Sequence, residues 1–158
     1  MRGSMQAASI LLTPFDFHMR VYWEDTDAGG VVFYANYLKF FERARTEWLR
    51  SLGIGQRALH EEKGLVFVVT DTRLRYRQPA RLDDELRVSA ALGAGGLAGR
   101  ATMSIEQAAW RGDTLLVDST TRLACVDAGT FRPRRIPNTL LDALAAQHRP
   151  TQAQTREP

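Results

Sequence analysis

One segment of the chain repeats its hydrophobic residues with the period of an α-helix. Between Asn36 and Gly53 the apolar side chains fall on one stripe and charged side chains fall opposite, the stripe being Tyr37, Phe41, Ala44, Trp48 and Leu52, with Phe40 and Leu49 beside it. Asn36 is predicted to cap this helix and Gly53 to follow its last turn. The pattern predicts a long amphipathic helix, followed by a shorter helix over residues 55–63.

Most other segments alternate hydrophobic and polar residues with a period of two, which is typical of strands. The predicted strands cover residues 17–25, 66–77, 85–92, 97–107 and 114–127. A last helix is predicted over residues 138–146. Strands and helices do not alternate as in a βαβ protein, so a parallel sheet is disfavoured. A strand, a long helix and four successive strands predict an α+β domain whose antiparallel sheet buries one face on the helix.

The length of 158 residues fits one domain. We expect a flexible N-terminal extension over residues 1–16, the domain over residues 17–147, and a flexible tail over residues 148–158. No apolar run is long enough for a membrane span, and the N-terminus lacks the features of a signal peptide. The single cysteine, Cys125, excludes an intramolecular disulfide and fits a reducing compartment. Together these features predict a cytoplasmic protein.

Charge adds little to this interpretation. The formal net charge is +3, but the basic residues are mostly arginines scattered along the chain rather than gathered in a stripe, so we expect no nucleic-acid partner. The cysteine and the three histidines lack the spacing of a zinc site, so no metal is expected.

The stretch VYWEDTDAGGVVFYANY gathers acidic residues just before the long helix. If the segment is extended, Asp25 and Asp27 share one face, and Asp25→Asn should then have a smaller effect than Asp27→Asn. One interpretation is structural, because an aspartate before Gly-Gly forms turns readily. The other is chemical: a carboxylate near a helix N-terminus, with backbone N–H groups to stabilise an oxyanion, suits ester-type chemistry. The residues alone leave both open.

At this motif the sequence resembles the hotdog-fold acyl-CoA thioesterases of the 4-hydroxybenzoyl-CoA thioesterase group, and most closely their YbgC-type branch. The resemblance runs from VYWEDTDAGGVVFYANYLKFFERARTEWLR through FVVTDTRLRYRQPARLDDELRV to ACVD. It implies a hotdog fold, in which an antiparallel sheet wraps around a long central helix. It also implies a homodimer joined sheet edge to sheet edge, or a homotetramer built from two such dimers, with active sites between subunits.

The resemblance also implies the roles of individual residues. Asp27 corresponds to the catalytic carboxylate, which acts as general base or as nucleophile, and the backbone N–H of Tyr34 corresponds to the oxyanion donor. Many YbgC-type members have histidine at the Tyr34 position. The remaining substrate-binding residues that we expect are Gly30, Val31, Phe33, Phe67 and Val68, together with Arg132 and Arg134 as candidates for binding the phosphates of CoA.

The implied function is hydrolysis of an acyl-CoA to a carboxylic acid and free CoA, without a cofactor apart from the CoA of the substrate. An acyl carrier protein is a further candidate partner. The alternative is a non-hydrolytic module that binds acyl-CoA or acyl carrier protein and is linked to the Tol-Pal envelope system. A hotdog dehydratase is disfavoured because such enzymes usually use histidine, and the motif region contains none.

Overall fold

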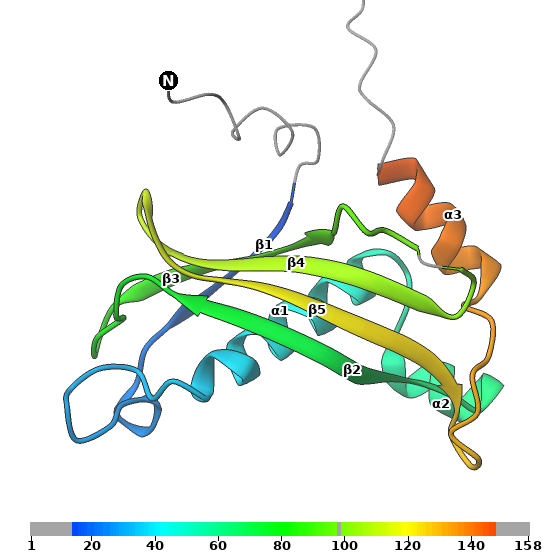
Figure 1. Cartoon of the computed structure of the whole chain (residues 1–158), viewed down its shortest axis with the longest axis horizontal. Coiled ribbons are helices and arrows are strands. Elements are labelled where there is room, and N and C mark those ends of the chain that lie inside the picture. Colours follow the sequence, from blue (N-terminus) through cyan, green and yellow to red (C-terminus); the bar gives the residue numbers. More distant parts are fainter. Residues whose placement is uncertain (1–13, 98, 148–158) are drawn as a thin grey trace, which may run out of the picture.

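The structure is a computed structural model that describes residues 14–97 and 99–147. Its sheet has five antiparallel strands in the order β1-β3-β4-β5-β2. Helix α1 lies along one face of the sheet (Figure 1). The elements are β1 (Phe15–Arg20), the 3₁₀ turn η1 (Trp23–Asp25), α1 (Asn36–Ser51), α2 (Gln56–Lys63), β2 (Leu65–Tyr76), β3 (Glu85–Leu92), β4 (Thr102–Arg111), β5 (Thr114–Asp127) and α3 (Asn138–Gln147). The α+β class is confirmed.

Helix α1 provides the centre of the core. Its predicted stripe is buried from Tyr37 to Leu49, with Leu52 half-buried just after the helix, and the fully buried side chains include Phe40, Phe41 and Trp48. Burying each such side chain stabilises the fold by about 1.5–3 kcal/mol. The first half of α1 packs with β1 and β3, and the second half packs with α3 and the opposite end of the sheet.

The helix ends were predicted with mixed success. Gly53 follows α1 with φ of 84°, a conformation that glycine adopts without strain, so this prediction is confirmed. Asn36 is not the N-cap, because Ala35 occupies that position and Asn36 is the first helical residue. The Asn36 side chain is instead buried against Asp25.

The predicted first strand over residues 17–25 is wrong at both ends. Strand β1 covers Phe15–Arg20, so the predicted N-terminal extension includes two residues of the sheet, and residues 1–13 of that extension lie outside the described residues. Beyond β1 the chain forms η1, whose Trp23 is 79% exposed. Aromatic composition suggested a strand there, but the Asp25 side chain accepts the Tyr22 N–H and closes a turn instead.

Strand β4 is also displaced from its prediction of residues 97–107. Gly96 and Gly99 have φ of 50° and 75°, which breaks extended structure before Thr102, and the strand then continues to Arg111. The alternation itself was predicted correctly, since Met103 and Ile105 are buried together.

Strand β2 is one edge of the sheet, hydrogen-bonded to β5 on one side only. A β-bulge between Val69 and Asp71 shifts the register. From Val69 to the end of the strand most side chains are exposed, Val69 and Tyr76 at 51% and 49%. The long edge therefore presents backbone groups and apolar side chains to whatever lies beside it.

The C-terminal end of the described chain is helical. Helix α3 ends one residue later than predicted and buries Leu140 and Leu144 against the core. The predicted tail over residues 148–158 lies outside the described residues. Among the helices that the structure describes, none is both long and apolar enough to cross a membrane.

Candidate active site

The acidic motif forms a small hairpin between η1 and α1. Thr26 and Val32 pair as an isolated antiparallel bridge, and the Asp27 N–H donates to the Val31 carbonyl at 2.9 Å. Gly30 has φ of 75°, which lets the chain reverse direction without the strain that another residue would experience. The Val32 N–H donates to the Ala80 carbonyl at 2.8 Å and ties the hairpin to the segment after β2.

Asp27 has one engaged and one open carboxylate oxygen. Its Oδ1 accepts the Gly29 N–H at 2.8 Å, which is the contact of a turn-forming aspartate. Its Oδ2 accepts no hydrogen bond from the described residues, and the side chain is exposed. The turn interpretation and the chemical interpretation are therefore compatible, since each uses a different oxygen.

The Tyr34 amide lies in the turn that leads into α1. The preceding amide, that of Phe33, donates to the Asp25 carbonyl at 2.9 Å, whereas the Tyr34 N–H has no acceptor within the described chain. An unpaired backbone N–H can stabilise an anion or a developing oxyanion. Asp27 and the Tyr34 amide thus lie on the two sides of one short hairpin stem.

Aromatic rings surround this helix start. The Phe33 and Tyr34 ring centroids are 4.9 Å apart, and those of Tyr34 and Tyr76 are 6.4 Å apart. The Tyr76 hydroxyl donates to the Tyr34 carbonyl at 2.8 Å. Partial burial raises the pKa of Tyr76, so its phenol stays protonated and keeps donating. Tyr76 therefore holds the peptide that follows the candidate oxyanion donor, a role that its strand pattern did not indicate.

The other predicted substrate-binding residues lie in two separate parts of the fold. Gly30 and Val31 belong to the hairpin. Phe67 and Val68 lie near the start of β2, where successive side chains point to opposite faces of the sheet. Phe67 packs against the core on the α1 side, opposite Cys125, and Val68 pairs with Ala124 on the other face. The two side chains cannot line the same surface of one protomer.

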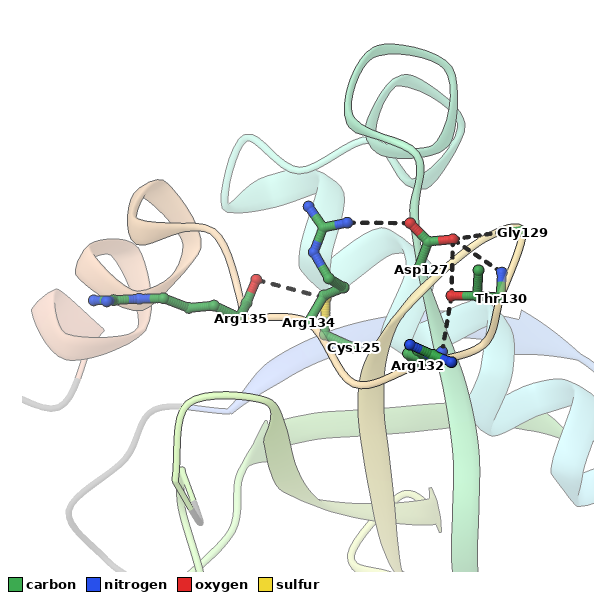
Figure 2. A network of polar contacts seen from close by, with 7 residues as sticks. All are labelled: Cys125, Asp127, Gly129, Thr130, Arg132, Arg134 and Arg135. Carbon is green, nitrogen blue, oxygen red and sulfur yellow. Dashed lines mark hydrogen bonds and ion pairs between the residues drawn. The ribbon is translucent and has the colours of Figure 1, made fainter.

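Arg132 and Arg134 lie in the loop after β5, which Asp127 organises (Figure 2). Asp127 Oδ1 accepts hydrogen bonds from the backbone N–H groups of Gly129 and Thr130, both at 2.9 Å. Its Oδ2 pairs with the Arg134 guanidinium at 3.1 Å. The Thr130 and Gly129 backbone hydrogen bonds hold the pKa of Asp127 below its usual range, and Arg134 lowers it further. Arg132 has an exposed side chain.

The arginine loop and the Asp27 hairpin lie at opposite ends of the sheet (Figure 1). Leu65, at the start of β2, pairs with Asp127, whereas Tyr76, at the end of β2, contacts Tyr34. At about 3.3 Å per residue, the twelve residues of β2 separate these ends by roughly 36 Å. One protomer therefore does not bring Arg132 and Arg134 to Asp27.

Other reactive groups are remote from the hairpin or inert. Cys125 is buried, and burial raises the pKa of its thiol. Across residues 14–97 and 99–147, no three His, Cys, Asp or Glu side chains group as metal ligands would.

Two buried polar residues of the site were not identified as such from the sequence. Asp25 and Asn36 are 6% and 8% exposed, and the Asn36 amide donates to Asp25 Oδ1 at 3.4 Å. The expectation that Asp25 shares a face with Asp27 is wrong, because η1 turns Asp25 inward while Asp27 stays exposed. Asn36, the polar residue that begins the helix, was the feature of the sequence that could have indicated this contact. An asparagine at that position is more often an N-cap, so capping was predicted instead.

Comparisons with known proteins give the family. Residues 21–144 match the family described as the thioesterase-like superfamily. The chain is 46% identical over 127 residues to the acyl-CoA thioesterase YbgC of Haemophilus influenzae, covering 78% of this chain and 88% of that one. It is 39% identical to the acyl-CoA thioester hydrolase YbgC of Escherichia coli, covering 82% and 94%.

A solved structure agrees with these relatives. The probable thioesterase from Bartonella henselae superposes with a TM-score of 0.74 at 34% identity, over 79% of this chain and 100% of that one. The predicted hotdog fold and thioester-hydrolase class are confirmed, and these relatives give no support to the non-hydrolytic Tol-Pal alternative. The chain belongs to the thioesterase-like superfamily and, within it, to the YbgC family of acyl-CoA thioesterases.

Proposed function

We propose that this chain cleaves the thioester of an acyl-CoA at the hairpin before α1, with Asp27 as the catalytic carboxylate and the Tyr34 N–H as the oxyanion donor. The observation that carries the proposal is the pair of unused groups there: Asp27 Oδ2 and the Tyr34 amide have no partner within the described chain. Family membership supplies the reaction class. The sequence resemblance implies the residue roles, and the two open groups support them.

The reaction needs a nucleophile for the carbonyl carbon and a donor for the carbonyl oxygen. Asp27 Oδ2 either removes a proton from an attacking water or attacks the carbon itself to give a mixed anhydride that water then opens. In both routes negative charge develops on the carbonyl oxygen, and the Tyr34 N–H stabilises it. The CoA thiolate leaves and takes up a proton, so the products are the carboxylic acid and free CoA.

Release of the CoA thiol from a series of thioesters tests the activity. Acetyl-CoA to palmitoyl-CoA, together with benzoyl-CoA derivatives, would identify the acyl group. Multiple-turnover release from at least one member is expected. Tight binding of the series without thiol release would contradict the proposal.

The second part of the proposal is a homodimer in which each site uses both subunits. The edge of β2 has no strand partner within the described chain, and Val69 and Tyr76 of this strand are exposed. An antiparallel two-fold pairing of β2 edges would set the Leu65 end of one strand beside the Tyr76 end of the other. Arg132 and Arg134 would then approach Asp27 of the other subunit and bind the phosphates of CoA.

Intersubunit complementation tests this arrangement. Asp27→Asn and the double variant Arg132→Gln/Arg134→Gln should each be impaired alone. When they are co-expressed with different tags, half of the dimers should be mixed, and each mixed dimer should contain one intact site. Recovery to about a quarter of wild-type activity is expected from random pairing. Activity equal to the mean of the two parents would rule out a shared site.

We further propose that the reaction requires neither a metal nor a thiol. Cys125 is buried with a raised pKa, and the described residues lack a metal-ligand cluster. Hydrolysis should therefore continue at nearly the wild-type rate in EDTA and in Cys125→Ala. Loss of turnover on chelation with recovery on adding zinc would contradict this prediction. The acyl carrier protein and the cytoplasmic location stay predictions.

A further inference from the structure

Asp25 and Asn36 make a buried polar contact that the proposed reaction does not use directly. Asn36 Nδ2 donates to Asp25 Oδ1 at 3.4 Å, and Asp25 Oδ2 accepts the Tyr22 N–H at 2.8 Å. Both side chains are over nine-tenths buried. Burying a carboxylate is costly unless it is hydrogen-bonded, and these two contacts give each oxygen of Asp25 a hydrogen bond.

The contact joins the two ends of the segment that carries both proposed reacting groups. Asp25 ends η1 and stands two residues before Asp27, and Asn36 begins α1 and stands two residues after Tyr34. The backbone between them closes through the Phe33 N–H and the Asp25 carbonyl at 2.9 Å. The side-chain contact therefore fixes the start of α1, and the free amide before it, against the strand that leads into Asp27.

Asn36 does not serve its own helix in the usual way. An asparagine at a helix start ordinarily accepts a backbone N–H as the N-cap, but here Ala35 is the N-cap and no side chain caps the helix. The Asn36 amide instead donates outward, to Asp25. This use of the side chain indicates positioning of the loop rather than stabilisation of α1.

We propose that the Asp25–Asn36 pair positions the Asp27 carboxylate relative to the Tyr34 N–H, and that both residues are positioning residues for thioester hydrolysis. The inference rests on the proposed function, because it takes Asp27 and the Tyr34 amide as the reacting groups. A displacement of about 1 Å between such groups can lower a rate roughly a hundredfold. The pair should therefore act on kcat more than on KM.

A side-chain swap in the full-length chain tests the proposal. Asn36→Asp sets two carboxylates against each other, although an aspartate in the first turn favours the helix itself. We expect kcat to fall by about tenfold to a hundredfold, with KM changed by less than about threefold. Asp25→Asn/Asn36→Asp restores a donor and an acceptor with unchanged net charge, and should return kcat to within about threefold of wild type.

Two further variants keep the test decisive. Asn36→Ala removes only the donor and should lower kcat by about tenfold. This variant measures the loss of the contact independently if Asn36→Asp folds poorly. Wild-type kcat in both single variants, or a double variant no faster than Asn36→Asp, would overturn the proposal. Asp27→Asn is measured in parallel. Wild-type activity there would refute the proposed function itself, whereas an inactive Asp27→Asn with a failed swap would refute only the role of the pair.

Discussion

Replacing Asp27 with asparagine is expected to lower kcat by about a hundredfold or more while leaving the fold and the proposed dimer intact. The amide keeps the oxygen that accepts the Gly29 N–H, so the turn survives. It loses the basicity and nucleophilicity that the open oxygen would supply. The measurement is the rate of CoA thiol release at saturating substrate, with thermal melting as the check on folding.

Glu24→Gln is the matched control for Asp27→Asn. Glu24 is an exposed acid three residues away in η1, and the same neutralisation there should leave kcat nearly unchanged. Asp25 is unsuitable for this purpose because it is buried and hydrogen-bonded. If folded Asp27→Asn hydrolyses substrate as fast as wild type, Asp27 is only a turn former.

Val69→Glu is expected to give a folded monomer with less than about one hundredth of wild-type activity, because a site built from two subunits loses half of its groups. Val69 is 51% exposed on the free edge of the sheet, so the substitution should disturb the core little. A charge there would be buried without a partner in the proposed dimer. Sedimentation velocity at the assay concentration, combined with the thiol-release assay, measures both effects.

The opposite edge of the sheet provides the control for the dimer. His18 is exposed on β1, and His18→Glu adds a similar charge to an edge strand outside the proposed interface. That variant should remain dimeric and active. A Val69→Glu monomer with wild-type activity would contradict the shared site, and an active wild-type monomer would do the same.

The elements that the sequence predicted well are those whose burial follows a simple period. The α1 stripe from Tyr37 to Leu49 is buried on one side, and the bounds of β3 and β5 agree with their predictions because alternate residues of each strand are buried, as Leu86, Val88 and Ala90 are in β3. Predictions failed where local hydrogen bonds override composition. The Asp25 carboxylate turns an aromatic-rich segment into η1, and two left-handed glycines delay the start of β4.

The site was predictable in part. The resemblance at the motif suggested Asp27 and Tyr34, whose catalytic roles stay predictions, and the structure places both in the hairpin before α1. Spacing cannot indicate a tertiary contact, so the roles of Tyr76 and of the Asp25–Asn36 pair were not predicted. The distance between Arg134 and Asp27 was also not predicted, because it depends on the length and direction of β2.

The central claim is that Asp27 and the Tyr34 amide act on the thioester carbonyl. The most direct test is a crystal structure of the protein with an acyl-CoA analogue in which a methylene group replaces the thioester sulfur, since this ketone cannot be hydrolysed. We expect its carbonyl oxygen at about 2.7–3.1 Å from the Tyr34 nitrogen. We also expect an Asp27 carboxylate oxygen about 3–3.5 Å from the carbonyl carbon, or one water molecule away from it. A carbonyl bound beyond the reach of both groups would show that Asp27 and the Tyr34 amide do not act on the thioester.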